Sequence, residues 1–252
     1  MELPPKDLWE LERESMAAWP TMVETPLGEW HLRFARHAFG RSHAVQTLGD
    51  PGMALADAIA VCEKSFGPSD LPVKFRIPEL GDWVAIDALL VERGYDEEDR
   101  TEVWITDLPD ATADPAVILS EAPDHDWFEL TLGHPATGSD REEAKFEIYR
   151  RLPAPCRFAS LSVDGMVVSV GCGNVHNGTL WIFGMATRPE FRRQGLGSRV
   201  AASLLAWART EGAHRAALQV VEGNAPAQAL YRKLGYRYVY RYHYRQLNRP
   251  TT

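Results

Sequence analysis

Two hydrophobic periods divide most of this chain into expected helices and strands. In the N-terminal part, apolar residues three or four apart predict the helices Asp7–Trp19, Ala54–Phe66 and Trp83–Arg93. Short apolar or alternating runs between them predict the strands Glu29–Ala35, Ser42–Leu48, Leu71–Ile77 and Thr101–Leu108. Turn signals fall around Phe39-Gly40 and at the acidic Asp96–Asp99, and the Pro- and Asp-rich stretch Pro109–Pro115 predicts a linker.

The C-terminal part has a similar order of elements. Its predicted strands are Ala116–Glu121, Arg157–Val163, Val167–Gly173, Leu180–Ala186 and Ala216–Val221. Its predicted helices are Asp126–Leu132, Glu142–Leu152, Arg199–Thr210 and Ala227–Leu234. Asp164-Gly165 and Asn177-Gly178 are typical hairpin turns. From Tyr236 to Tyr244 a tyrosine occupies every second position, which predicts one tyrosine face on a half-buried final strand.

Two helix ends in the chain match each other. Ala88–Tyr95 (ALLVERGY) aligns with Ala229–Tyr236 (ALYRKLGY), so that Leu90 corresponds to Tyr231. Each segment follows a predicted strand and precedes another. We therefore predict two tandem copies of one α/β unit.

The run Arg192–Ser198 (RRQGLGS) between a strand and a helix predicts an anion site. Glycine has no Cβ, so a ligand can approach the backbone closely at Gly195 and Gly197. The first amides of the following helix lack intrahelical partners, and the helix dipole adds positive charge there. Such a turn binds phosphate groups. The corresponding N-terminal segment, Gly49–Gly52 (GDPG), contains an acid and no arginine pair, so it suits phosphate poorly.

Two common glycine-rich phosphate loops do not fit this run. A mononucleotide P-loop requires a Lys directly after its last glycine, where this chain has Ser198. A dinucleotide fingerprint requires a third glycine, where this chain has Val200. A nucleotide-binding protein is therefore disfavoured.

The residues downstream make the pattern specific. Arg192-x-x-Gly195-x-Gly197 is followed by a helix, a strand and the segment Asn224–Tyr236 (NAPAQALYRKLGY). This combination resembles the GNAT superfamily of N-acetyltransferases, strongly over Trp181–Tyr236 and by pattern alone over Pro115–Val175. The resemblance implies the acyl-CoA N-acyltransferase fold, of the α/β (α+β) class: a mixed, mostly antiparallel, twisted sheet flanked by helices. Residues 1–110 would be a degenerate GNAT-like domain and residues 115–252 the catalytic domain.

The resemblance also implies where acetyl-CoA, the co-substrate, would bind. Its pyrophosphate would lie on the loop Arg192, Arg193, Gln194, Gly195, Leu196, Gly197 and Ser198. Its pantetheine arm would pair with the backbone of Met185, Ala186 and Thr187, where the strand splays from its parallel neighbour, and Asn224 would hydrogen-bond this arm or its loop. Tyr231 would contact the sulfur and protonate the departing thiolate as general acid. A helix aromatic packed on the sheet is the alternative for Tyr231.

The general base is less defined by the sequence. Glu222 stands at the C-terminal end of its predicted strand and is one candidate, although a strand-end carboxylate is often solvated or caps a helix. His176, His134 and an ordered water are the alternatives. Direct attack of an amine on a thioester requires proximity and proton transfer, and no metal is expected.

Composition limits the classes of partner and the cellular location that we expect for the protein. The 252 residues suffice for two cores, and the net charge of −8 argues against a nucleic-acid surface while favouring cationic substrates. The three cysteines are odd in number and lack C-x-x-C spacing, so we expect no disulfide scaffold and no zinc site. No leader pattern and no apolar run long enough to span a bilayer is seen, so we expect a cytoplasmic protein that requires no membrane.

These observations predict an N-acetyltransferase that moves the acetyl group of acetyl-CoA to a primary amine of a small molecule or peptide. A non-catalytic acyl-CoA-binding sensor or scaffold is the alternative. The sequence leaves the acceptor and the oligomeric state open.

Overall fold

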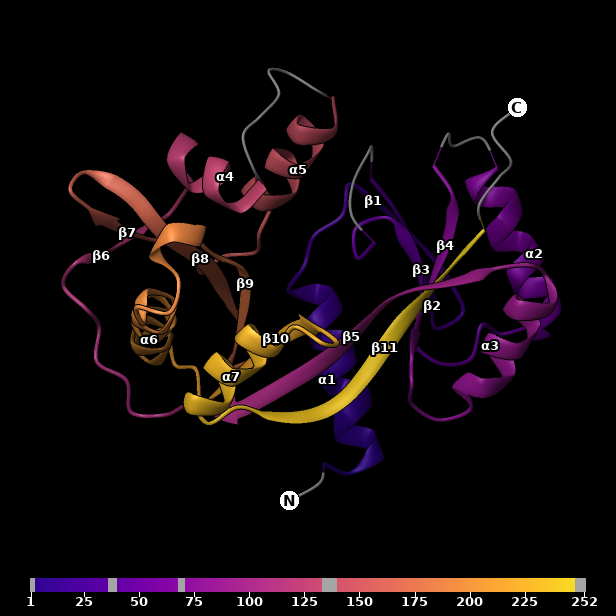
Figure 1. Cartoon of the computed structure of the whole chain (residues 1–252). Helices are drawn as coiled ribbons and strands as arrows, with labels where there is room; N and C mark the ends of the chain where they lie inside the picture. The colour runs from indigo at the N-terminus through magenta and orange to yellow at the C-terminus, as the bar shows by residue number, and fades with distance from the viewer. Residues whose placement is uncertain (1–2, 36–39, 68–70, 133–139, 248–252) are drawn as a thin grey trace. The chain divides into compact units, whose positions relative to one another are not determined.

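The computed structural model describes residues 3–35, 40–67, 71–132 and 140–247 of the chain (Figure 1). It contains two compact units, Met1–Glu102 with Val239–Thr252, and Val103–Tyr238. Strands β5 (Asp96–Asp107) and β11 (Arg237–Leu247) contribute residues to both units.

The first unit contains three helices among its described residues. Besides residues of β5 and β11, its elements are α1 (Pro5–Ala17), β1 (Val23–Leu27), β2 (Trp30–Phe34), β3 (Ala44–Thr47), α2 (Leu55–Phe66), β4 (Val73–Pro78) and α3 (Trp83–Glu92). β1, β2 and β3 pair antiparallel, β3 and β4 pair parallel, and β4 pairs antiparallel with β11. Helices α2 and α3 pack on a fully buried apolar sheet face that includes Trp30, Phe75 and Ile77 (Figure 1).

The other face of this sheet carries a buried polar cluster under α1. Glu12 of α1 is fully buried and forms an ion pair with Arg76 of β4. Its carboxylate also accepts a hydrogen bond from the Tyr240 hydroxyl at 2.5 Å, and the Arg76 guanidinium stacks 3.6 Å from the Tyr242 ring. Charged groups are rarely buried without partners, so this cluster fixes α1 on the sheet.

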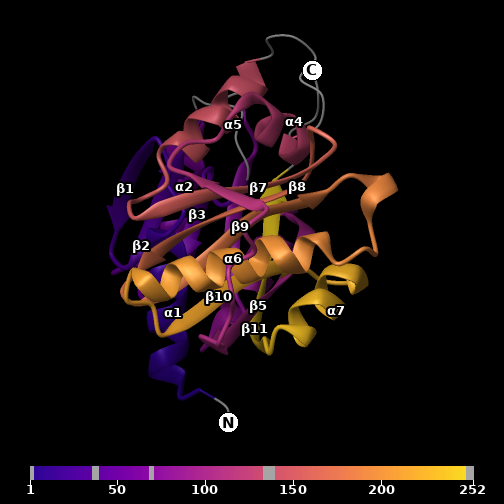
Figure 2. The same ribbon diagram turned by 90° about the vertical axis from the view of Figure 1, so that its left-hand side faces the viewer.

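The second unit begins within β5. Its elements are β6 (Val117–Ser120), α4 (His125–Leu132), α5 (Asp140–Arg150), β7 (Cys156–Val163), β8 (Met166–His176), β9 (Thr179–Thr187), the 3-10 turn η1 (Pro189–Phe191), α6 (Leu196–Thr210), β10 (Arg215–Val221) and α7 (Ala225–Lys233). β6 to β9 pair antiparallel, and β9 and β10 pair parallel. Figure 2 shows α6 crossing strands β7 to β9, and its apolar side packs against them through Val200, Leu204 and Leu205.

The two halves of the chain repeat one order of elements. Three antiparallel strands lead through a helix to a parallel strand, and then through a second helix to a last strand. This is β1-β2-β3-α2-β4-α3-β5 in the first half and β7-β8-β9-α6-β10-α7-β11 in the second. The mixed, mostly antiparallel sheets flanked by helices confirm the predicted fold class. The repeated order supports tandem copies. The domain division at residues 110–115 stays a prediction, while the compact grouping places residues 103–114 with the second unit and 239–252 with the first.

Several sequence predictions need correction. Asp96–Asp99 is not a turn, because it belongs to β5, where Glu98 binds Lys74 and Gln246 at 3.0 and 2.9 Å. β1 was missed. The tyrosine face is incomplete: Tyr240, Tyr242 and Tyr244 are buried, whereas Tyr238 is 49% exposed. The turn predicted around Phe39-Gly40 lies largely outside the described residues.

The predicted linker is not a free connection. Within the second unit, the Asp110 carboxylate pairs with Arg209 and the Asp114 carboxylate with Arg199 of α6. The Asp114 amide also donates to the Ser203 hydroxyl at 2.9 Å. Residues 108–116 therefore run along α6 without regular secondary structure.

Candidate functional site

Strands β9 and β10 diverge towards their C-terminal ends. Their parallel pairing, over the described residues, runs from Thr179 and Arg215 to Ile182 and Leu218. Beyond it β9 continues to Thr187, still paired with β8 on its other side. The segment Met185–Thr187 therefore keeps one edge of its backbone free of β10, as the predicted splay requires.

A bulge shapes this part of β9. Gly184 has φ +60°, and the β8–β9 register shifts between Val170 and Cys172. A Cβ at Gly184 would lie 3.0 Å from the Trp127 ring and 3.1 Å from the Tyr149 hydroxyl. Helices α4 and α5 thus press on the bulge, and only glycine fits there. An isolated glycine inside a strand pattern is a bulge signal, so the sequence offered this feature and the prediction missed it.

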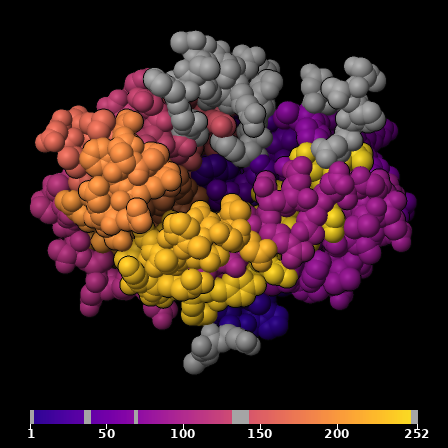
Figure 3. Space-filling view, in the orientation of Figure 1, coloured from indigo at the N-terminus to yellow at the C-terminus, as the bar shows by residue number. Residues whose placement is uncertain are grey.

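The loop between β9 and α6 has the backbone of an anion cradle. Arg193 and Gly195 adopt left-handed conformations with φ of +62° and +77°. Across the part of the chain that the structure describes, no backbone amide from Arg193 to Ser198 donates a hydrogen bond. Arg192 to Gly195 are exposed, and the segment lies at the surface in the orange region of Figure 3. Unpaired amides in such a turn form an anion-binding concavity at the positive end of α6.

Three of the predicted elements meet at this cradle. A Cβ on Gly197 would lie 3.2 Å from the Leu230 side chain of α7 and 3.6 Å from the Thr187 hydroxyl of β9. That hydroxyl lies 2.9 Å from the Ser169 hydroxyl of β8, which fixes the end of β9. The Arg192 side chain donates to the Thr187 carbonyl at 3.2 Å. The structure therefore brings the strand end, the cradle and α7 together.

The side chains of Asn224 and Gln194 have local partners. Asn224 is the N-cap of α7, and its Oδ1 accepts from the Ala227 amide at 3.3 Å. Gln194 Nε2 donates to the Glu190 carbonyl at 3.4 Å. Asn224 is exposed. The contact expected between Asn224 and the pantetheine arm stays a prediction.

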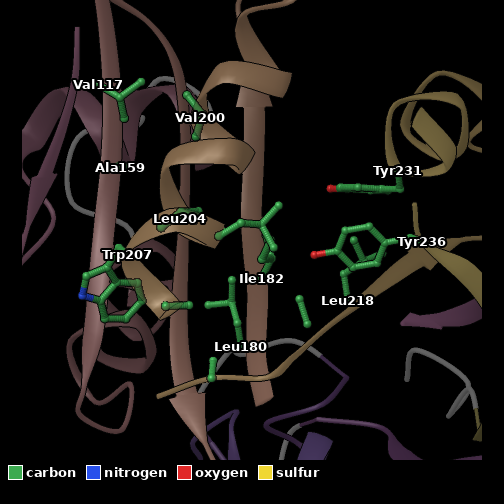
Figure 4. Close-up of a cluster of buried hydrophobic side chains, with 14 of the residues drawn as sticks. Val117, Ala159, Leu180, Ile182, Val200, Leu204, Trp207, Leu218, Tyr231 and Tyr236 are labelled. Carbon is green, nitrogen blue, oxygen red and sulfur yellow. The ribbon is translucent and has the colours of Figure 1, made fainter. Parts of the chain in front are cut away.

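Tyr231 lies one position after Leu230, and its side chain is 7% exposed. Burial raises the pKa of its hydroxyl to about 12. The Tyr231 hydroxyl makes no hydrogen bond with the other described residues. Its ring contacts that of Tyr236, with centroids 5.7 Å apart, and Figure 4 shows both hydroxyls pointing towards Ile182 of β9. Tyr231 is thus a buried, protonated phenol that points towards β9.

The candidate bases differ in position. Glu222 follows β10 directly and is exposed, at the same sheet edge as the end of β9. His176 pairs with Thr179 at the start of β9, so the length of this strand separates it from Thr187. His134 lies outside the described residues. Of the two described candidates, Glu222 is the one at the sheet edge where β9 ends.

The matching loop of the first unit binds its own carboxylates. The Asp50 amide donates to Glu29 Oε2, and the Gly52 amide donates to Asp50 Oδ1, both at 2.8 Å. A Cβ on Gly49 would lie only 2.2 Å from the Glu29 carboxylate. The acidic side chains therefore take the place that an anionic ligand would need.

The described residues offer neither a cluster of three or more metal-ligating His, Cys, Asp or Glu side chains nor a helix suited to crossing a membrane.

Comparisons with known proteins give a family match and a curated relative. The model of the acetyltransferase (GNAT) family matches residues 122–236. An uncharacterized N-acetyltransferase, YobR of Bacillus subtilis, is 26% identical over 246 residues, which are 95% of this chain and 98% of that protein.

Two solved structures resemble the whole chain or most of it. A GCN5-related N-acetyltransferase from Kribbella flavida superposes with a TM-score of 0.67 at 17% identity, covering 99% of this chain and 97% of the other. A tandem GNAT protein of the clavulanic acid biosynthesis pathway gives 0.57 at 16% identity, covering 78% of this chain and 69% of the other. At these identities the likeness shows the fold.

Proposed function

Because the chain carries a domain of the acetyltransferase (GNAT) family over residues 122–236, and is an acyltransferase by that membership, we propose that it transfers the acetyl group of acetyl-CoA to a primary amine. One observation supports this proposal most: Gly197, in the loop with the unpaired amides, lies against Thr187 at the free strand edge and against Leu230, the neighbour of Tyr231. The loop, the strand edge and Tyr231 would bind in turn the pyrophosphate, the pantetheine arm and the thioester of the co-substrate.

The cradle would hold the pyrophosphate through the amides of residues 193–198 and the charge of Arg192 and Arg193. The backbone of Met185, Ala186 and Thr187 would pair with the amides of the pantetheine arm, as a further strand does at a sheet edge. Both contacts fix the thioester beside Tyr231, where proximity supplies a large part of the rate enhancement.

The reaction requires an uncharged amine and a protonated leaving group. The amine attacks the thioester carbonyl, the carbon–sulfur bond breaks, and Tyr231 gives its proton to the sulfur. Glu222, or a water that it binds, would accept the proton lost by the amine. The acceptor would be a small-molecule or peptide amine, and the net charge of −8 favours a cationic one. The three free cysteines support a reducing, cytoplasmic setting.

Titration calorimetry of acetyl-CoA into the wild type, Gly195→Asp and Gly195→Asn tests the binding site. A Cβ at Gly195 meets nothing within 4 Å, and Asp and Asn both tolerate left-handed backbone and favour helix N-caps. Both variants should fold, and only Asp places a negative charge against the pyrophosphate. We expect micromolar binding, about −8 kcal/mol, to be abolished in Gly195→Asp and largely kept in Gly195→Asn. Equal binding by wild type and Gly195→Asp would reject the cradle.

A second measurement separates the enzyme from a non-catalytic acyl-CoA sensor. In an amine screen, Tyr231→Phe should lose most turnover while its acetyl-CoA affinity remains. A wild type that binds acetyl-CoA and acetylates no amine in the screen would favour the sensor. The exposed Glu222 would then have no catalytic role.

A further inference from the structure

Tyr236 lies next to the proposed general acid and has a buried hydroxyl without a use in the fold. The residue is 3% exposed, and its hydroxyl oxygen has no hydrogen-bond partner among the described residues. An unsatisfied buried hydroxyl costs roughly a tenfold or greater factor in folding equilibrium. A phenylalanine would fill the same space without that cost.

The first unit contains a matched position that shows what a structural tyrosine does there. Tyr95 follows α3 as Tyr236 follows α7. The amide of Tyr95 donates to the Leu90 carbonyl at 3.0 Å, and the amide of Tyr236 donates to the Tyr231 carbonyl at 3.0 Å. Each tyrosine follows a left-handed glycine with φ of +81° or +83°. The backbone is the same in both copies.

The side chains of the two copies differ at two points. The Tyr95 hydroxyl donates to Glu63 at 3.2 Å, and its neighbour Leu90 is apolar. The Tyr236 hydroxyl has no such partner, and its neighbour is the phenol Tyr231. The free donor therefore occurs in the copy that carries the proposed acid.

The hydroxyls of Tyr231 and Tyr236 point the same way from adjoining rings (Figure 4). Burial raises the pKa of the Tyr236 hydroxyl far above its usual range, and the neighbouring Tyr231 raises it further. Tyr236 therefore stays protonated and available as a donor whenever Tyr231 carries negative charge.

We propose that Tyr236 is a positioning residue for acetyl transfer, whose hydroxyl donates a hydrogen bond to the Tyr231 oxygen once Tyr231 gives its proton towards the sulfur. The proposal rests on the function proposed above. As the carbon–sulfur bond breaks, the sulfur takes the Tyr231 proton, and the resulting phenolate accepts the hydrogen bond from Tyr236. The proton lost by the acetylated nitrogen then returns to Tyr231 through solvent, so protons balance over the cycle.

The need for such a donor follows from acidity. A free thiol has a pKa of about 8.5, so a phenol at about 12 is a poor proton donor to a thiolate. Hydrogen bonds to charged groups are the strong ones, and a donor to the phenolate oxygen makes Tyr231 more acidic.

The test uses free CoA, the thiol product, as the probe and needs no acceptor. The ultraviolet absorbance of the thiolate gives the pKa of the thiol of enzyme-bound CoA. Tyr231→Phe should raise this pKa by about one unit, or tenfold, because the donor to the thiolate is lost. Tyr236→Phe should raise it by about 0.3 unit, or twofold, since it weakens that donor through cooperativity.

Two comparisons make the result decisive. The double variant Tyr231→Phe with Tyr236→Phe should equal Tyr231→Phe alone, because Tyr236 acts only through Tyr231. Tyr95→Phe, the matched control, should leave the thiol titration unchanged. Tyr236→Phe should also fold with undiminished stability.

The outcomes separate the two proposals. If the wild type does not bind CoA, the proposed function fails and this inference fails with it. If CoA binds but Tyr236→Phe leaves the thiol pKa unchanged, or its shift adds to that of Tyr231→Phe, the role of Tyr236 is wrong and the proposed function stands.

Discussion

His43 makes the first unit sensitive to mild acid. Its side chain is 6% exposed, and burial lowers its pKa from 6.5 to about 4, with Lys74 adding repulsion. The Ala35 amide donates to Nδ1 at 3.3 Å, and the ring packs edge-on against Phe34 and Phe66. A protonated Nδ1 cannot accept that bond, so the charged form loses both solvation and a partner.

The sign and size of the effect follow from linkage. The folded pKa lies below the unfolded one, so the stabilisation is complete above pH 6.5 and is lost as pH falls towards 4. The full shift of 2.5 units corresponds to about 3 kcal/mol, of which about 2 kcal/mol is lost between pH 7 and 5. The pKa values of the ion-paired Asp87 and Glu97 carboxyls are lowered from 3.8 and 4.5, so their contributions disappear at lower pH.

Urea unfolding at pH 7, 6 and 5 of the wild type and of His43→Phe isolates this term. The free energy of unfolding of the wild type should fall by about 2 kcal/mol more than that of the variant over this range. The other histidines titrate alike in both proteins, so their contribution cancels when the two changes in the free energy of unfolding are subtracted. Parallel pH profiles would refute the reasoning, because they would mean that His43 titrates alike in the folded and unfolded chain.

Three substitutions probe the packing that supports the site and the fold. Glu12→Ala should cost about 3–5 kcal/mol in urea unfolding, because it leaves the Arg76 guanidinium, 1% exposed, without its ion pair. Gly184→Ala should cost about 2 kcal/mol in the same assay and reduce acetyl-CoA affinity, because the added methyl requires a left-handed alanine and meets Trp127 at 3.0 Å. Asn224→Ala should lower the free energy of unfolding by about 1 kcal/mol through the lost helix cap, and a larger loss of acetyl-CoA affinity than of stability would indicate direct contact.

The sequence predicts the local features of this protein well. Hairpins at Asp164-Gly165 and Asn177-Gly178 appear with the left-handed backbone that their residue types favour. The run Arg192–Ser198 forms the expected turn into α6, although the helix begins at Leu196, three residues earlier than predicted. These features depend on backbone preferences and amide geometry within a few residues, which one sequence specifies.

Features set by distant partners were not accessible in this way. Asp96–Asp99 has the composition of a turn, yet Glu98 is held in a strand by Lys74 and Gln246, two partners far away in the chain. The bulge at Gly184 is shaped by Trp127, whose position depends on α4. Pairing of this kind outweighs local propensity, so a pattern read along the chain gives the wrong state or misses the feature.

The two copies differ in how the donors of matching segments are satisfied. In the first copy, Glu29 accepts from an amide of the turn and Glu63 accepts from the Tyr95 hydroxyl, so each local donor has a partner within the protein. In the second copy, the amides from Arg193 to Ser198 and the Tyr236 hydroxyl have no such partner among the described residues. Unused donors are costly in a folded protein. An anionic ligand that carries a sulfur leaving group beside Tyr231 would satisfy them together, directly at the cradle and through Tyr231 at Tyr236.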